Sequence, residues 1–401
     1  MDQQGADVVI VGGGIIGTSA AAFLAEAGAR VVLVESERIG AAASGRNSGF
    51  IQDPFDPTLA LLHTESVSHY RQLTDASRGS ARPFALPDEP SGLLVVATDP
   101  SAIEQIVRDL EASAPHMNPV FLSGAELRRL EPALAPGVVA CRLGIGYPVR
   151  PASAVEAYAA LAKGRGAEIV LGSPARLSVA GDRVVGVEMD GGTIVADTVI
   201  VAAGPWTPAL LDPRGGWRPI VPIWGVILEI ELEHPPAHVL EESENTMSIE
   251  PPKSGDVRLG EVVFSLITAE GRSSLGSTFL AGQPDVATYR EVLVGRGARF
   301  VPAVANAQVL GTRLCPRPVS RDGRPLVGPV PWLPGAIIAA GHGPWGISTG
   351  PATGRMAADL ALGRSPAIPA ALSPARFGNP LGVVADDPED ATPVVDDIQL
   401  T

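Results

Sequence analysis

Three glycines near the start of the chain have the spacing of a phosphate-binding loop. Gly12, Gly14 and Gly17 read G-x-G-x-x-G. In such a loop the first glycine permits a tight turn, the second lets the backbone approach a pyrophosphate, and the third lets the next helix pack closely on the strand. The free N–H groups and positive dipole end of that helix then face the phosphates. We therefore expect dinucleotide binding here rather than a purely structural turn.

The elements around the loop are those that such a site needs. An apolar strand at Asp7–Val11 precedes it, an alanine-rich helix from Thr18 to Ala27 follows and ends at Gly28, and a second apolar strand runs over Ala29–Val34. Together they make a βαβ unit. Glu35 closes the second strand, where a carboxylate accepts hydrogen bonds from ribose hydroxyls and repels a 2′-phosphate. NADP is disfavoured, and FAD and NAD stay as alternatives.

Three later segments decide between these cofactors: Ala43–Gly49 (ASGRNSG), Val201–Trp206 (VAAGPW), and Arg317–Pro325 (RPVSRDGRP) followed by Ala340–Ile347 (AGHGPWGI). Their order and spacing resemble the D-amino acid oxidase superfamily, the group of glycine oxidase, sarcosine oxidase and D-amino acid dehydrogenase. They are similar to its flavin-phosphate loop, its A-x-G-x-W strand end beside the pyrophosphate, and its R-P-x-x-x-D-G … G-H-x-x-x-G signature, whose turn caps the isoalloxazine. The resemblance spans the FAD-binding parts of nearly the whole chain, whereas residues 216–311 match only in general pattern.

The resemblance implies FAD as the cofactor. Ser44 and Asn47 offer hydrogen bonds to phosphate and ribityl oxygens, and Arg46 either neutralises the pyrophosphate or is a solvated surface arginine. The backbone N–H groups of Gly341–Ile347 suit the negative charge of a reduced flavin, the alternative being a plain strand–helix connection. The expected cofactor-binding residues are Gly12, Gly14, Ile15, Ile16, Gly17, Glu35, Ser36, Ser44, Arg46, Asn47, Ser48, Ala175, Ala203, Gly204, Trp206, Cys315, Gly341, Gly343, Gly346 and Ile347.

Three residues are candidates for contact with the substrate. Arg317 is the expected carboxylate clamp, because a guanidinium binds a carboxylate through two parallel hydrogen bonds; a structural ion pair with Asp322 is the alternative. The resemblance places His342 and Trp345 near the flavin ring, where each is either a catalytic or a packing residue.

Cys315 has two possible roles. In monomeric sarcosine oxidases a cysteine seven residues before the signature aspartate joins the flavin 8α-methyl through a thioether, and Cys315 has that offset from Asp322. The bond needs a thiolate, which Arg313 and Arg317 are expected to favour. The alternative is a buried packing cysteine.

The lysines differ from those of sarcosine oxidases, which use a lysine above the flavin to promote reaction with oxygen. This chain has two lysines, Lys163 and Lys253, none in Gly271–Gly276, and Ser348 where those enzymes carry another. The electron acceptor is therefore O2 or another acceptor, such as a quinone or a protein.

The predicted fold is α/β, with a Rossmann-type FAD-binding domain and a second domain built on a mostly antiparallel β-sheet. We assign residues 1–85, 145–215 and 312–380 to the FAD domain and residues 86–144 and 216–311 to the substrate domain. The acidic tail at 381–401 is expected to be disordered.

Composition narrows the partners. A formal net charge of -14 argues against nucleic acid and anionic membranes. Neither a membrane-spanning stretch nor a signal peptide is expected, and the two cysteines and scattered histidines form no metal motif, so a cytoplasmic location is the default.

The favoured function is FAD-dependent oxidation of the C–N bond of an amino acid or a secondary or cyclic amine, by hydride transfer to flavin, giving an imine. The alternatives are a flavoenzyme that tailors a specialised metabolite, a cyclic amine or an alcohol, and a flavin-binding subunit of a larger complex.

Overall fold

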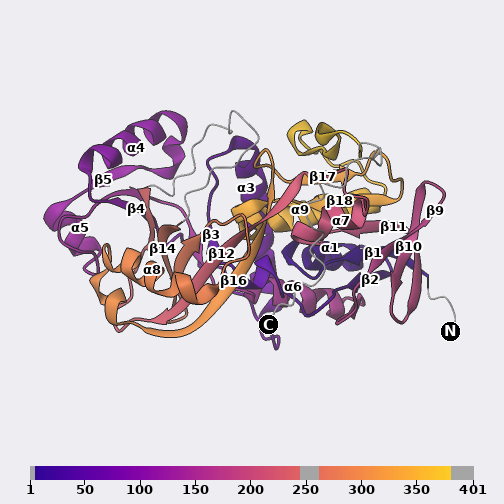
Figure 1. Cartoon of the computed structure of the whole chain (residues 1–401), viewed down its shortest axis with the longest axis horizontal. Helices are drawn as coiled ribbons and strands as arrows, with labels where there is room; N and C mark the ends of the chain where they lie inside the picture. Colours follow the sequence, from indigo (N-terminus) through magenta and orange to yellow (C-terminus); the bar gives the residue numbers. More distant parts are fainter. Residues whose placement is uncertain (1–4, 244–261, 381–401) are drawn as a thin grey trace.

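The computed structural model describes residues 5–243 and 262–380. The predicted acidic tail and Lys253 lie outside these residues. Two sheets with their helices lie side by side along the long axis of the molecule (Figure 1). The predicted fold class is confirmed.

The first sheet is built on the βαβ unit. Its strand order is β17 (Leu326–Pro329), β18 (Ala336–Ala340), β11 (Gly192–Val201), β1 (Ala6–Val11), β2 (Val31–Val34) and β8 (Glu168–Val170). The five strands from β18 to β8 are parallel, and β17 is antiparallel to β18. β9 (Arg176–Ala180) and β10 (Arg183–Met189) extend from β11 as an antiparallel pair.

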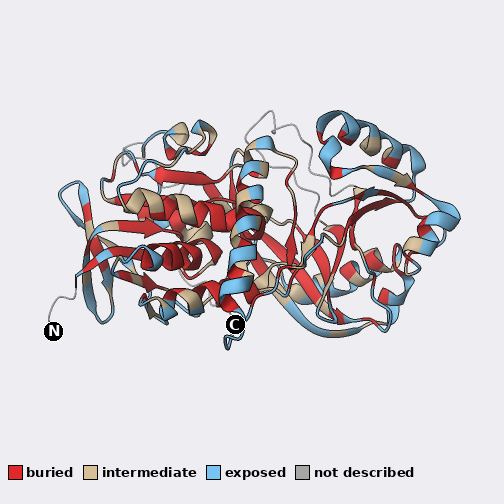
Figure 2. Ribbon diagram, turned by 180° about the vertical axis from the view of Figure 1, so that it is seen from behind, coloured by how far each residue is buried: buried red, intermediate tan, exposed pale blue. Residues whose placement is uncertain are grey.

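Both faces of this sheet are covered, which explains the apolar run in β1. Val8 and Ile10 pack on the helical side, whereas Val9 and Val11 join a second cluster on the other face with Trp217. The helical side carries α1 (Ile15–Glu26), α6 (Ser153–Gly164) and α9 (Gly346–Ala361), with α3 (Pro57–Ser77) packed on α9. Figure 2 shows this core as the densest buried region of the molecule.

The second sheet is mostly antiparallel. Its order is β16 (Gln308–Ser320), β12 (Ile220–Glu231), β15 (Arg272–Thr278), β14 (Val262–Ala269), β13 (Val239–Glu242), β4 (Leu93–Ala97), β6 (Val139–Leu143) and β5 (Val120–Leu122). One face is apolar and packs on α8 (Val286–Ala298). At the β4 end, the other face packs on α4 (Pro100–Ser113). Shorter elements are α2 (Ala43–Arg46), β3 (Phe50–Ile51), α5 (Gly124–Leu130), β7 (Tyr147–Pro148) and α7 (Thr207–Leu211).

The first helix differs from its predicted bounds. It begins at Ile15 rather than Thr18, with Gly14 as its N-cap, and ends at Glu26. The prediction placed the start of the helix too far along the chain because Gly17 is a poor helix former, yet Gly17 lies inside the first turn of the helix. A side chain there would overlap the carbonyl of Gly12, so Gly17 is required by close packing of helix on loop.

Two glycines of α9 bring its start next to that of α1. A Cβ at Gly350 would lie 2.8 Å from Ile15, and one at Gly354 would overlap the hydroxyl of Ser19. The two helices therefore pack closely, and their N-termini open onto the same cavity.

Candidate functional site

A cavity of about 570 Å³ lies where the two sheets meet. It is lined by the carboxyl ends of β1, β2, β11 and β18, and by residues of β4 and of β12 to β16. Open α/β sheets bind ligands at the carboxyl ends of their strands, and a cavity of this size is typical of small-molecule sites. Here the second sheet closes the site from the opposite side.

The glycine loop has the geometry that a pyrophosphate requires. Gly12 has a φ of +116°, and a Cβ there would overlap the carbonyl of Ala202. Gly14 has an ordinary φ of −78°, so its backbone accepts a side chain, but a Cβ would lie 3.0 Å from the hydroxyl of Ser44. Gly12, Gly14, Ile15 and Ile16 line the cavity, and Gly17 lies behind them. The start of α1 thus faces the cavity without an intervening side chain.

Glu35 holds the loop in place from the end of β2. Its carboxylate accepts hydrogen bonds from the N–H groups of Gly13 at 2.6 Å and Glu37 at 2.9 Å, and from the Ser36 hydroxyl at 3.1 Å. Glu35 and Ser36 line the cavity, so the carboxylate combines a structural role with its predicted position at the ribose end.

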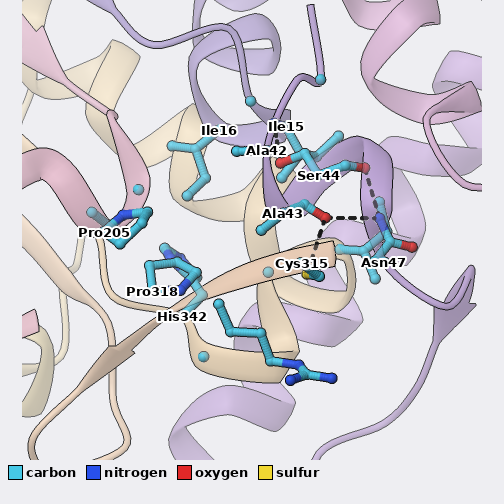
Figure 3. A pocket seen from close by; sticks show the side chains of 18 of the residues that line it. Ile15, Ile16, Ala42, Ala43, Ser44, Asn47, Pro205, Cys315, Pro318 and His342 are labelled. Carbon is cyan, nitrogen blue, oxygen red and sulfur yellow. Dashed lines mark hydrogen bonds between the residues drawn. The ribbon is translucent and has the colours of Figure 1, made fainter. Parts of the chain in front are cut away.

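The α2 loop closes one side of the cavity (Figure 3). The Ser44 hydroxyl accepts a hydrogen bond from the Ile15 N–H at 2.9 Å, which ties the loop to the start of α1. The Asn47 amide donates to the carbonyls of Ser44 and Ala43 and accepts from the Gly49 N–H at 2.7 Å. The Asn47 side chain thus holds its own loop and also lines the cavity, and its predicted contact with phosphate or ribityl oxygens stays a prediction.

Most of the predicted cofactor residues line this one cavity. Besides those already placed, they are Ser48, Ala175, Ala203, Gly204, Trp206, Gly343, Gly346 and Ile347. Arg46 is not among the lining residues. Its guanidinium lies 3.5 Å from the carbonyl of Leu314 on β16 and the residue is half-buried, so it is not the solvated surface arginine of the alternative, and its role at the pyrophosphate stays a prediction. Gly341 also lies behind the lining, where its φ of +91° and its contacts with Ile220 and Leu326 require a glycine.

His342 precedes the turn that leads into α9. Its Nε2 lies 2.9 Å from the hydroxyl of Thr353, and its Nδ1 is buried without a hydrogen-bond partner among the described residues. Burial lowers the pKa of His342 to about 3, so the ring is neutral at physiological pH. His342 and Trp345 both line the cavity. A neutral imidazole with one open nitrogen suits a hydrogen bond to a bound group better than proton transfer.

The cavity fits a flavin dinucleotide in three respects. Two helix N-termini, those of α1 and α9, open onto it. Because Gly14 has no side chain, space is left in the cavity next to the start of α1. The third is His342, a lining residue whose buried Nδ1 has no partner among the described residues. Within the described ranges, no group of His, Cys, Asp or Glu side chains is arranged to hold a metal ion.

Arg317 projects from β16 across the second sheet into the cavity. Its guanidinium donates to the carbonyl of Thr278 at 2.8 Å and to the Ser277 hydroxyl, and lies 4.3 Å from the centre of the Phe279 ring. It passes directly over Gly225, where any side chain would collide with it. Burial lowers the pKa of Arg317, but an arginine still stays protonated at neutral pH.

The alternative partner of Arg317 is not observed. Asp322 is paired with Arg376, whose Nε lies 2.6 Å from its carboxylate. In the part of the chain that the structure describes, no carboxylate is paired with Arg317. A buried cation at a cavity wall without a counter-ion is suited to an anionic ligand.

Cys315 lies two residues before Arg317 and also lines the cavity (Figure 3). Its sulfur is 3.9 Å from the carbonyl of Ala43. Burial raises the pKa of the Cys315 thiol, and the nearby guanidinium groups of Arg317, Arg313 and Arg46 lower it without offsetting burial. The arginines act in the predicted direction, but burial outweighs them, and the covalent bond to the flavin stays a prediction.

Several lining residues were missed by the sequence analysis. They come from β3 and the segment after it, and from the second sheet and the residue that follows β15, and are Phe50, Gln52, Phe55, Leu93, Val95, Ile227, Glu241, Ser265, Ser277 and Phe279. The most polar pair, Gln52 and Glu241, is hydrogen-bonded at 3.3 Å across a separation of 189 positions. No local motif marks either residue, and Glu241 stands in a sequence, Val-Leu-Glu-Glu, that looks like an exposed edge.

Comparisons with known proteins also indicate an FAD-dependent oxidoreductase. The family described as FAD dependent oxidoreductase (DAO) matches residues 7–360. Glycine oxidase of Pseudomonas aeruginosa is 29% identical over 384 residues, 92% of this chain and 98% of that protein. D-amino acid dehydrogenase of Paramagnetospirillum magneticum is 27% identical over 425 residues, 90% of this chain and 96% of that protein. The crystal structure of glycine oxidase from Geobacillus kaustophilus has a TM-score of 0.78 at 25% identity, covering 92% and 98%.

Proposed function

The chain belongs to the DAO family of FAD-dependent oxidoreductases, and from this premise we propose that it oxidises the C–N bond of an amino acid or a related amine that carries a carboxylate. The observation that carries the proposal is the buried Arg317, which lines the cavity close to the turn before α9 without a carboxylate partner among the described residues. The relatives named above act on glycine or D-amino acids, which share a carboxylate next to the carbon that bears the amine.

In the proposed reaction, bound FAD supplies the acceptor for a hydride from the α-carbon. Arg317 binds and orients the carboxylate, since it lines the cavity and its planar guanidinium can bind a carboxylate through two hydrogen bonds. The N-terminus of α9 provides a fixed dipole for the negative charge that develops during the transfer. The apolar walls at Leu93, Val95 and Phe279 exclude water. The imine that forms is hydrolysed by water after release.

The electron acceptor is O2 or another acceptor such as a quinone. No lysine is found among the lining residues, and the Ser348 hydroxyl accepts a hydrogen bond from the Gln52 N–H at 2.9 Å. No helix within the described ranges is long and apolar enough to cross a bilayer.

The proposal is tested by anaerobic flavin bleaching. Purified protein is mixed with D-, L- and N-methyl amino acids, and with cyclic amines that have or lack a carboxylate. We expect bleaching by at least one α-amino acid, and none by the matched amine without a carboxylate, because Arg317 needs that partner. Bleaching by amines without a carboxylate alone would show that the cavity serves a different substrate. Reoxidation by O2 or by an added quinone then identifies the acceptor.

Cys315 is a candidate for a thioether to the flavin 8α-methyl, supported by its place in the cavity wall. The expected result of acid precipitation is a yellow protein band that fluoresces on a denaturing gel and is colourless in Cys315→Ala. Cys141, buried in β6 away from the cavity, is the matched control, and Cys141→Ala should keep the band. Quantitative release of FAD from the wild-type protein would leave Cys315 as a packing residue.

A further inference from the structure

Glu241 is a second charged group on the substrate side of the cavity, and the function proposed above does not use it. It lies on β13, opposite Ser265 of β14 and Val95 of β4, and all three residues line the cavity. Its carboxylate accepts a hydrogen bond from the Gln52 amide at 3.3 Å, and no described cation is paired with it. Burial raises the pKa of Glu241 to about 7, and the hydrogen bond from Gln52 lowers it by less.

The neighbour of Glu241 is different. Glu242 points to the opposite face of the sheet, where it is ion-paired with Arg296 at 2.8 Å and accepts the Phe264 N–H. Successive residues of a strand face opposite sides, so Glu241 must face the cavity. Glu242 thus makes the ion pair and the backbone hydrogen bond that stabilise this end of β13. These contacts do not explain why Glu241 is also a carboxylate.

The sheet register fixes the relation of Glu241 to Arg317. The Arg317 guanidinium reaches Ser277 and Thr278 at the end of β15. From β15 the register continues from Gly276 to Ser265 on β14 and from Ser265 to Glu241 on β13. Two strand spacings correspond to roughly 10 Å. The strands that carry the two contacts are therefore about 10 Å apart, and no ion pair between Glu241 and Arg317 is present among the described residues.

Two opposite charges that line one cavity on strands this far apart suit a small zwitterion placed between them. In an α-amino acid the amine and carboxylate are joined through a single carbon, with bonds of about 1.5 Å. Adding one charge-assisted hydrogen bond of about 2.8 Å at each end gives a span of roughly 8–9 Å. We propose that the carboxylate of Glu241, held by Gln52, accepts a hydrogen bond from the substrate's ammonium group while Arg317 binds the substrate's carboxylate. The site then selects α-amino acids as zwitterions. This inference rests on the proposed function.

The assignment also gives the amine proton a destination. An N–H bond of the substrate ammonium breaks and an O–H bond forms on Glu241, which leaves a lone pair on nitrogen. That lone pair drives loss of the α-hydrogen as hydride, so the amino acid loses two electrons and FAD gains them. A carboxylate that titrates near neutrality is suited to taking this proton.

The surroundings of Glu241 make its charge measurable. β14 and β4, which flank it, contribute no titratable side chain. Across the cavity the described groups are Arg317, which stays protonated, Cys315, whose thiol pKa is raised by burial, and His342, which stays neutral above a pKa of about 3. Asp53, next to Gln52, lies 3.3 Å from the ring of the exposed His116. Glu241 is thus the described lining group expected to titrate between pH 6 and 9 on the substrate side.

The experiment compares glycine with propanoate, in which a methyl group replaces the ammonium. Binding to the flavin-loaded protein is measured by titration calorimetry under anaerobic conditions from pH 6 to 9, for wild type, Glu241→Gln and the control Glu231→Gln. Glu231 is a carboxylate of the same sheet, at the exposed end of β12 near Arg272. Glycine is also titrated in competition with propanoate, and its rate of flavin bleaching is recorded.

For wild type and Glu231→Gln we expect propanoate affinity to fall about tenfold as Glu241 ionises, because the propanoate carboxylate and the Glu241 carboxylate are like charges that repel in the cavity. In Glu241→Gln this pH dependence should vanish, and glycine binding should weaken about 10- to 100-fold. Unchanged glycine affinity and an unchanged propanoate profile in Glu241→Gln would overturn the assignment. If no amine bleaches the flavin, the proposed function fails separately. In that case the competition experiment still tests the amine contact. Displacement of propanoate by glycine in wild type but not in Glu241→Gln would support the contact, and equal displacement or none in both proteins would refute it.

Discussion

Replacing Arg317 by alanine is expected to raise the Michaelis constant for a carboxylate-bearing substrate by well over tenfold. The guanidinium is buried, lines the cavity and has no carboxylate partner among the described residues, so a bound carboxylate would complete its hydrogen bonding. Loss of a charge-assisted bidentate contact corresponds to about 1.5–3 kcal/mol, or roughly 10- to 150-fold. Steady-state kinetics with the best substrate of the bleaching panel measure this effect.

Two further variants separate charge from geometry. Arg317→Lys keeps the charge but loses the planar fork, so it should restore little of the affinity. Arg313 is the matched control, since it is a partly buried arginine on the same strand whose guanidinium donates to the Ser274 hydroxyl and does not line the cavity. Arg313→Lys should leave the Michaelis constant unchanged. If Arg317→Ala is folded and flavin-loaded and has wild-type kinetics, Arg317 does not bind the substrate carboxylate. An uncharged amine is then favoured as the substrate.

The cofactor side of the cavity was predictable because backbone conformation determines it. Gly12 needs a left-handed φ, and Gly17 needs the absence of a side chain, so each leaves a mark in the sequence at a fixed spacing. The same logic accounts for Gly341, which was predicted to bind cofactor but is required by its own φ and by packing on Ile220. A glycine pattern therefore predicts where a loop lies better than which of its residues touches a ligand.

The substrate side could be predicted only at Arg317, where a family-like motif marks the residue. Glu241 and Gln52 come from separate parts of the chain, and only the pairing of β13 with β4 and β14 brings Glu241 to the cavity wall. Arg46 shows the reverse case, because it lies in the predicted loop yet contacts β16 instead of the cavity. Contacts between distant strands depend on tertiary packing, which a single sequence does not display.

Replacing Gly14 by valine is expected to abolish FAD retention while leaving the fold intact. The backbone at Gly14 has an ordinary φ of −78°, so the substitution introduces no backbone strain. A Cβ would lie 3.0 Å from the Ser44 hydroxyl, and the larger side chain would stand in front of the first N–H groups of α1. Losing two charge-assisted hydrogen bonds to the pyrophosphate corresponds to roughly a hundredfold or greater loss of affinity.

The measurement is the flavin-to-protein absorbance ratio after desalting, with circular dichroism and thermal melting to verify folding. Gly12 is unsuitable for this test, because a side chain there would overlap the Ala202 carbonyl and disturb the loop itself. Gly164 at the end of α6 is the matched control, since a Cβ there meets no atom within 4 Å and Gly164→Ala should stay yellow. The comparison is repeated in Cys315→Ala, so that a thioether cannot hold the flavin in place. Full flavin content in the folded double variant would show that the G-x-G-x-x-G loop is not the pyrophosphate site.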